Sequence, residues 1–166
     1  MIPVVVHNIT STSNQGFLSD ATIQSQIVVL NEDFQAIPGS PGDPGYDVRI
    51  QFELATVDPD GNPTNGIDRV ANDTWFADGG AYWNVLAWDP TRYLNIYTNN
   101  PGGGILGYVP WLPHMGAPGT PADRVVILYR AFGDPGSLPP YHLGRTTTHE
   151  VGHYMGLYHT FQDGCG

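Results

Sequence analysis

The spacing of three histidines near the C-terminal end restricts the fold of this chain more than any other feature. His149 and His153 are four residues apart, and His159 follows six residues later. Residues four apart in a helix project from one face, so the first two histidines can bind one metal ion. In a continued helix, the third would lie about 15 Å along the axis from the first and on another face. The chain must therefore turn back before the third histidine.

Gly156 lies where this helix has to end, and glycine readily adopts the left-handed conformation that ends many helices. A catalytic zinc ion takes three protein ligands and keeps a fourth position for water. The spacing therefore predicts a zinc site whose ligands are His149, His153 and His159. Glu150 stands where this motif has the general base that accepts a proton from the attacking water. The alternative is a degenerate zinc site without catalysis.

The other three histidines are interpreted as structural residues. His7 lies in the expected first strand, where a hydrogen-bonded core or edge histidine is commoner than a metal ligand. His114 and His142 lie among prolines and glycines, which indicates surface loops. Arg145 precedes the motif by one helical turn, and we interpret it as a structural charge on the helix.

The charge and hydropathy of the chain exclude two kinds of partner. The net charge is -10, with sixteen acidic residues against six arginines and no lysine, so nucleic acid is not expected to bind. Because no apolar run approaches the roughly 18 residues of a membrane span, no membrane partner is expected either. The first seven residues lack the apolar run of a signal peptide. If the protein is exported, its signal precedes this sequence.

The 166 residues are predicted to form one domain in which strands and helices share a single sheet. We expect strands at 3–10, 47–57, 93–98, 105–112 and 124–132, and helices at 19–36 and 143–157. Segment 67–90 is expected to be irregular, and segment 58–63 to be a turn rather than a calcium loop. The strand at 105–112 is placed at a sheet edge because it contains glycine and proline.

The segment from His149 to Phe161 closely resembles the active-site segment of the pappalysin family of metzincin metallopeptidases. Segments 2–7, 25–34, 88–96 and 105–108 agree with the same family. The resemblance implies a secreted endopeptidase, often made as a zymogen, with zinc and commonly calcium. It also implies an α/β (α+β) fold, the metzincin upper subdomain, in which a twisted five-stranded mixed sheet has a backing helix and an active-site helix.

One departure from the family concerns the methionine turn that metzincins have beneath the metal, after the third histidine. The methionines here are Met1, Met115 and Met155, all before His159. We therefore expect residues 1–166 to be the upper subdomain, with the lower one in a cleaved C-terminal portion or a separate chain. Cys165 is the one cysteine, and we expect its disulfide partner in that missing part.

Two functional hypotheses follow from these observations. The first is a secreted zinc endopeptidase in which Glu150 is the general base for a metal-activated water. Its protein or peptide substrate would pair antiparallel with the edge strand at Ile105, Leu106, Gly107 and Tyr108, since an exposed edge offers free main-chain groups. The second hypothesis is a non-catalytic zinc-binding fragment or an interaction module that lacks the lower subdomain.

Overall fold

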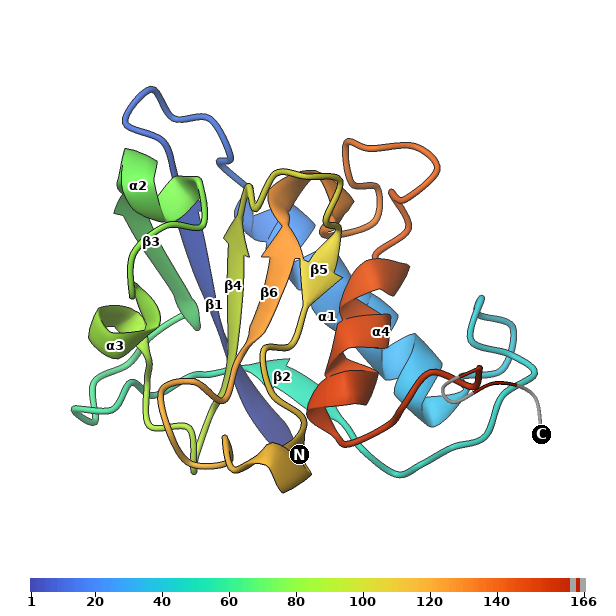
Figure 1. Cartoon of the computed structure of the whole chain (residues 1–166). Helices are drawn as coiled ribbons and strands as arrows, with labels where there is room; N and C mark the ends of the chain where they lie inside the picture. Colours follow the sequence, from blue (N-terminus) through green and yellow to red (C-terminus); the bar gives the residue numbers. More distant parts are fainter. Residues whose placement is uncertain (162–163, 165–166) are drawn as a thin grey trace.

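The computed structural model describes residues 1–161 and 164, which form one mixed sheet with helices on both faces (Figure 1). The strands are β1 (Ile2–Thr10), β2 (Phe52–Leu54), β3 (Ile67–Ala71), β4 (Leu94–Asn99), β5 (Gly107–Tyr108) and β6 (Val125–Leu128). The helices are α1 (Asp20–Gln35), α2 (Asp73–Phe76), α3 (Trp83–Leu86) and α4 (Arg145–Tyr154), with short 3₁₀ turns η1 (Pro113–Met115) and η2 (Tyr129–Ala131). In this part of the chain, no helix has the length and apolar composition to cross a membrane.

The sheet has the order β2-β1-β4-β6-β5, with β3 also paired to β1. The pairs of β1 with β2, β3 and β4 and of β4 with β6 are parallel, whereas β5 is antiparallel to β6. Since β2 pairs with residues 2–4 of β1 and β3 with residues 6–10, these two short strands share one side of β1. The sheet is therefore five strands wide but contains six strands.

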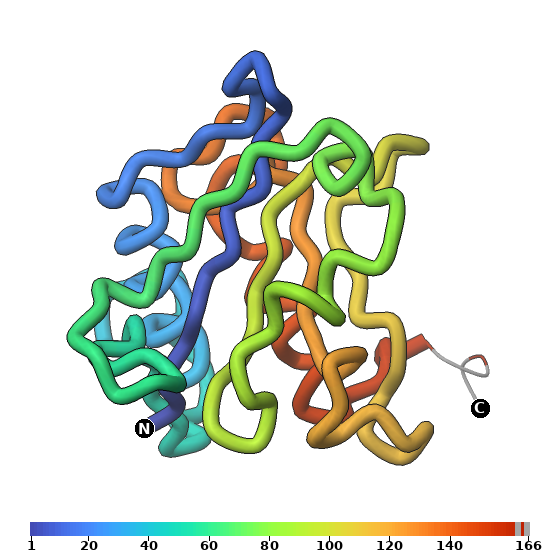
Figure 2. Tube along the Cα trace, turned by 90° about the vertical axis from the view of Figure 1, so that its left-hand side faces the viewer, coloured from blue at the N-terminus to red at the C-terminus, as the bar shows by residue number. Residues whose placement is uncertain are grey.

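Helices α1 and α4 cover one face of the sheet, and α2 and α3 cover the other (Figure 1). In Figure 2, which views the second face, the green segment with α2 and α3 lies in front of the strands. Alternate strand residues supply the two cores: Val4, Val6, Ile96 and Ile127 pack toward α1 and α4, and Ile9, Tyr97 and Val126 pack toward α2 and α3. A central strand with both faces covered explains the continuous apolar run in β6.

Helix α1 confirms the amphipathic helix expected between residues 19 and 36. The Ser19 hydroxyl caps its start by accepting a hydrogen bond from the Thr22 backbone N–H at 3.1 Å. Ile23, Ile27 and Leu30, which share one helical face, are all buried in the core.

The observed strands differ from the expectations in three segments. The strand predicted at 47–57 is reduced to β2, because Arg49 has a positive φ of 59° that interrupts the extended backbone. Segment 67–90, predicted to be irregular, contains β3. The edge strand predicted at 105–112 is only the two residues of β5. Its edge position and antiparallel direction nevertheless match a mixed sheet.

Candidate metal centre and cleft

The start of α4 is held by a side chain from α1 instead of by a cap of its own. Gly144 is the N-cap and has a left-handed conformation with no side-chain cap. The buried Gln26 side chain donates to the Gly144 carbonyl at 3.0 Å and accepts from the Gly133 N–H at 2.8 Å and the Thr147 hydroxyl at 2.9 Å. One amide therefore fixes where α4 begins and how it lies on α1.

The end of α4 has the geometry that the histidine spacing predicts. Gly156 has a φ of 96°, its N–H bonds to the His153 carbonyl at 2.8 Å, and the Leu157 N–H bonds to the Gly152 carbonyl at 3.0 Å. These two bonds form a Schellman motif, in which a left-handed residue reverses the chain after a helix. The reversal directs the following residues back along α4 and brings the third histidine to the first two.

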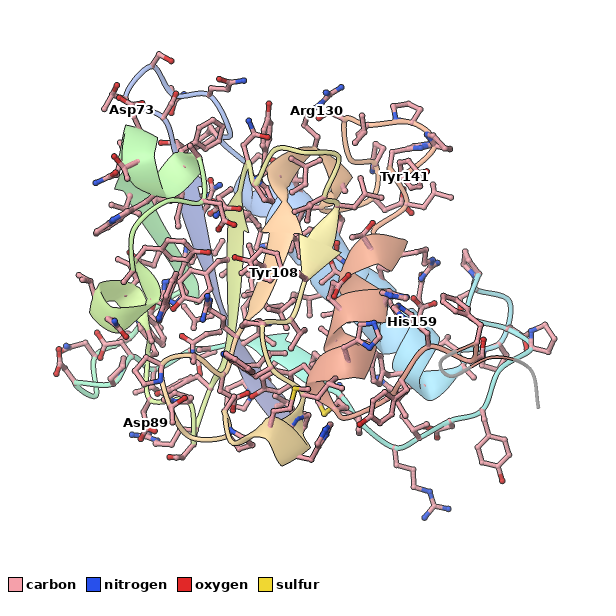
Figure 3. The ribbon with its side chains drawn as sticks, in the orientation of Figure 1. Asp73, Asp89, Tyr108, Arg130, Tyr141 and His159 are labelled. Atoms are coloured by element: carbon pink, nitrogen blue, oxygen red, sulfur yellow. The ribbon has the colours of Figure 1, made fainter. Side chains whose placement is uncertain are left out.

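The three histidine side chains converge on a single point. The Nε2 atom of His149 lies 3.0 Å from that of His159 and 3.0 Å from that of His153, and the third pair is 3.1 Å apart. Figure 3 shows His159 beside α4, which carries the other two. Within residues 1–161 and 164, this is the one group of three or more His, Cys, Asp or Glu residues whose ligating atoms are mutually close.

Hydrogen bonds among the three histidines cannot satisfy all three Nε2 atoms. The His153 Nδ1 lies 2.7 Å from the Leu157 carbonyl oxygen, which only accepts, so Nδ1 carries the proton and Nε2 of the neutral ring has a lone pair. Each imidazole nitrogen makes one in-plane hydrogen bond, so three mutually close Nε2 atoms cannot all be paired. A carbonyl that fixes the tautomer in this way is typical of histidines that bind metals.

The donor set fits a zinc ion. Nitrogens bound to one tetrahedral zinc at about 2.0–2.1 Å lie about 3.3 Å from one another. The observed separations of 3.0–3.1 Å are close to that value. Three neutral imidazoles also suit zinc better than they suit the hard cations calcium and magnesium, which prefer oxygen ligands.

Glu150 adjoins His149 in the sequence, but its side chain is buried whereas His149 is exposed. Burial raises the pKa of the Glu150 carboxyl above the ordinary value, although the nearby His153 opposes this change. Glu150 and His149 line a cleft of about 410 Å³ between α4 and β5. The other lining residues are Leu106, Gly107, Pro140, Tyr141, Leu143, Arg145 and Thr146.

The edge strand forms one wall of this cleft. A Cβ atom built on Gly107 would lie 2.8 Å from the Glu150 Cγ, so glycine permits β5 to approach the carboxylate closely. Leu106 and Gly107 line the cleft, whereas Ile105 is exposed just before β5 and Tyr108 points to the other face of the sheet. The structure therefore brings two of the four predicted substrate-binding positions to the cleft itself.

The opposite wall was missed by the sequence analysis. Tyr141 and Leu143 belong to the loop before α4, and their side chains are about half exposed (Tyr141 is labelled in Figure 3). The prolines and glycines around them predict only a loop, with nothing to indicate that it borders a cleft. Arg145 lines the cleft and also forms ion pairs with Asp33 and Glu32 of α1, which agrees with its structural interpretation.

His7 and His114 have the structural roles expected of them, whereas His142, expected on the surface, is half-buried in the loop before α4. His7 is fully buried, with Nδ1 3.0 Å from an Asp68 oxygen and Nε2 2.9 Å from the Asn95 Oδ1. His114 is exposed in η1, where its ring lies beside the Tyr158 hydroxyl. Cys165, with its expected disulfide, lies outside the described residues.

The fold and the reversal that gathers the histidines are those of the metzincin class of metallopeptidases. A family model described as pregnancy-associated plasma protein-A, peptidase family M43, matches residues 81–166. The chain belongs to this family, the pappalysins, as its sequence predicts.

Known relatives and solved structures agree with this family. An extracellular metalloprotease of Pyricularia oryzae is 38% identical over 169 residues, covering 99% of this chain and 52% of that protein. Another, from Coccidioides posadasii, is 34% identical, covering 96% and 52%. Mature mirolysin of Tannerella forsythia, solved in complex with a cleaved peptide, is 41% identical with a TM-score of 0.82, covering 98% of this chain and 65% of that one. The chain thus spans about half the length of the curated relatives it matches.

Proposed function

We propose that this chain is the metal-binding half of an exported zinc endopeptidase. The observation that carries the proposal is the convergence of three histidine Nε2 atoms at 3.0–3.1 Å beside a cleft lined by Glu150. The names of the relatives, extracellular metalloproteases, support export, and the cleaved peptide bound to mirolysin supports a peptide substrate. The lower subdomain, with the methionine turn, would lie in a part of the protein outside these residues.

In this proposal, His149, His153 and His159 hold the metal and Glu150 moves the proton. When bound, zinc supplies a Lewis acid that makes water nucleophilic near neutral pH and polarises the carbonyl that is attacked. The Glu150 carboxylate accepts the proton of the attacking water and returns it to the leaving amine nitrogen.

The substrate would lie along the outer side of β5. In the described part of the chain, β5 pairs with β6 alone, so its other side offers main-chain groups toward the cleft. An extended peptide that pairs antiparallel with these groups would pass Glu150, because Gly107 lies against that side chain. Main-chain pairing supplies affinity for any peptide, whereas the cleft walls select among side chains.

The direct test replaces Glu150 by glutamine in the full-length protein. We expect Glu150→Gln to keep one zinc ion per molecule and to lower the cleavage of casein at least about 100-fold, because an amide cannot accept the proton. Glu53→Gln, which changes an exposed carboxylate on β2, is the matched control and should cleave like the unchanged protein. A zinc chelator should abolish cleavage by both the unchanged protein and the control.

Two results would contradict the proposal. Retained cleavage by Glu150→Gln would remove the general-base role. A full-length protein that binds zinc but cleaves nothing, with or without chelator, would favour the alternative of a non-catalytic metal-binding module.

A further inference from the structure

The edge strand β5 has few main-chain contacts to hold it in place. It contributes only two residues to the sheet, Gly107 opposite Ile127 and Tyr108 opposite Val126. The preceding glycines at 102, 103 and 104 all have positive φ values, of 70°, 61° and 79°, and a Cβ on any of them would meet none of the described atoms within 4 Å. One further main-chain bond, from the Leu128 N–H to the Leu106 carbonyl at 2.8 Å, adjoins β5. A side-chain anchor would therefore help so short a strand to keep its register.

That anchor is on the face of the sheet opposite the metal centre. Neighbouring residues of a strand point to opposite faces, so Gly107 faces Glu150 while Tyr108 faces α2 and α3. The Tyr108 hydroxyl donates to the Asp78 carboxylate, whose two oxygens lie 3.0 and 2.9 Å away. Figure 3 labels Tyr108 beside β5.

Asp78 is itself held by two further donors. The buried Tyr82 hydroxyl donates to Oδ1 at 2.7 Å, and the Asn99 side-chain amide donates to the same atom at 2.8 Å. Asp78 follows α2 with a φ of 61°, a left-handed conformation that aspartate and asparagine tolerate better than most residues. Donors from β4, β5 and the start of α3 thus meet on one carboxylate in a fixed position.

Burial around this cluster strengthens the contact. Tyr108 is partly buried, and burial raises the pKa of its hydroxyl, so the group stays protonated and donates. A hydrogen bond to a charged acceptor is about twice as strong as one between neutral groups. The hydrogen bond from Tyr108 to Asp78 should therefore hold β5 more strongly than a single neutral main-chain hydrogen bond does.

We propose that Asp78 is a positioning residue for substrate: through the Tyr108 hydroxyl it fixes β5, and so it fixes the main-chain groups that pair with the peptide. This inference rests on the proposed function, because it assumes that the peptide lies along β5. Asp78 does not line the cleft, and its hydrogen bond to β5 is the one from Tyr108. Its loss should weaken peptide binding and leave the chemistry at Glu150 unchanged.

The test compares three variants of the full-length, zinc-loaded protein. Tyr108→Phe removes the donor and keeps the ring. Asp78→Asn keeps the shape and tolerates the positive φ, but it removes the charge. Tyr82→Phe is the matched control, because it removes a donor to the same carboxylate from a residue that does not belong to β5.

We expect KM for a long peptide to rise roughly tenfold in Tyr108→Phe and about threefold in Asp78→Asn, with kcat within about twofold of the unchanged protein. Amide hydrogen exchange in segment 105–109 should become faster in both variants. Tyr82→Phe should leave KM and the exchange of that segment unchanged. A merely structural role would instead lower the thermal stability of all three variants without a separate change in KM.

The outcomes separate this inference from the proposed function. If the unchanged protein cleaves peptide but Tyr108→Phe has the same KM and the same exchange in segment 105–109, the inference is wrong and the proposed function stands. If kcat falls with KM unchanged, Asp78 affects the chemistry and the positioning role is also wrong. If the unchanged full-length protein cleaves no peptide, the proposed function fails, and the inference fails with it.

Discussion

Two histidine sites in this protein use the same side chain in opposite ways. In the core, both ring nitrogens of His7 have a partner, Asp68 on one side and Asn95 on the other, and the ring stacks on Tyr97. At the end of α4, the Nε2 atoms of His149, His153 and His159 face one another with no set of hydrogen bonds that satisfies all three.

Hydrogen-bond partners, more than burial, are the ground on which His7 is assigned a structural role and the other three histidines are proposed as ligands. His7 is fully buried, yet its hydrogen bonds offset the cost of burying a polar ring. His149 is exposed and His153 half-buried, so water could solvate them, yet the chain holds their nitrogens together. Such an arrangement, maintained at a cost in unpaired polar atoms, is typical of a ligand-binding site and supports the proposed metal centre.

The largest effect should come from removing one of the three histidines proposed to bind zinc. We expect His153→Ala to lower zinc affinity more than about 100-fold, because it removes one of the proposed ligands. The metal-free protein should keep its stability within about 1 kcal/mol, since this half-buried side chain makes one hydrogen bond to the backbone. His114→Ala, which changes an exposed histidine, should keep zinc. Metal analysis and urea unfolding measure both quantities; equal zinc affinity in both variants would contradict the assignment.

At His7 we expect a substitution to lower stability and to leave zinc affinity unchanged. His7→Ala should lower the free energy of unfolding by about 3–5 kcal/mol, because it leaves a cavity and a carboxylate without its partner. The folded protein should bind zinc with affinity within about twofold of the unchanged protein. Urea unfolding measures the first result, and zinc titration at urea concentrations below the unfolding transition measures the second. A folded variant that has lost zinc would show that the two sites are coupled.

A smaller effect should follow from Gly156→Ala. The residue has a φ of 96°, so a side chain there should cost about 1 kcal/mol of stability. Gly61→Ala, at a φ of 89° in a distant turn, is the matched control and should cost the same. Zinc affinity should fall about tenfold only in Gly156→Ala. The adjoining Leu157 carbonyl keeps the proton of His153 on Nδ1 and so leaves Nε2 free to bind the metal. Equal affinities in the two variants would show that this carbonyl is unimportant.

The smallest effect concerns acid stability. The hydrogen bond from His7 holds the pKa of Asp68 below its ordinary value. Its contribution to stability is therefore present above the unfolded-state pKa of about 3.9 and is lost as the pH falls through the lower folded-state pKa. Because the Asp68 side chain is 36% exposed, solvent screening limits this contribution to about 1 kcal/mol or less.

The variant Asp68→Asn should flatten the dependence of unfolding free energy on pH below about pH 4. Glu53→Asn changes an exposed carboxylate and should leave that dependence nearly unchanged. Urea unfolding of the metal-free protein at several acidic pH values measures both. An unaltered acid dependence in Asp68→Asn would show that another group dominates.

The part of the site that is local in sequence could be predicted from the residues alone. The four-residue spacing of His149 and His153 and the position of Gly156 follow from helix geometry, and the observed left-handed glycine matches that prediction. The assignment of zinc to these residues stays a proposal. Helix α1 was also predicted correctly, because its cap and apolar face are local features.

The long-range features could not be predicted in the same way. β3 contains Asp68 and Arg69, so its alternation of apolar and polar residues is weak. It forms a strand because it pairs with β1. Ile50 packs against the core without belonging to a strand, which shows that alternating apolar residues report burial and not pairing. The contact of Asp78 with Tyr108 joins residues thirty positions apart and leaves no local signal.

Because of the hydrogen bonds of Gln26, we expect the proposed metal centre to be one of the last parts of the molecule to form. The Gln26 amide bonds to Gly133, Gly144 and Thr147, which follow it by 107, 118 and 121 positions. The start of α4 therefore lacks these bonds until the two ends of the chain have come together. Contacts between such distant positions form late, because the intervening chain must first lose its conformational freedom. In the proposed function, zinc uptake should therefore report the completion of folding, since a partly folded molecule would present no organised site for cleavage.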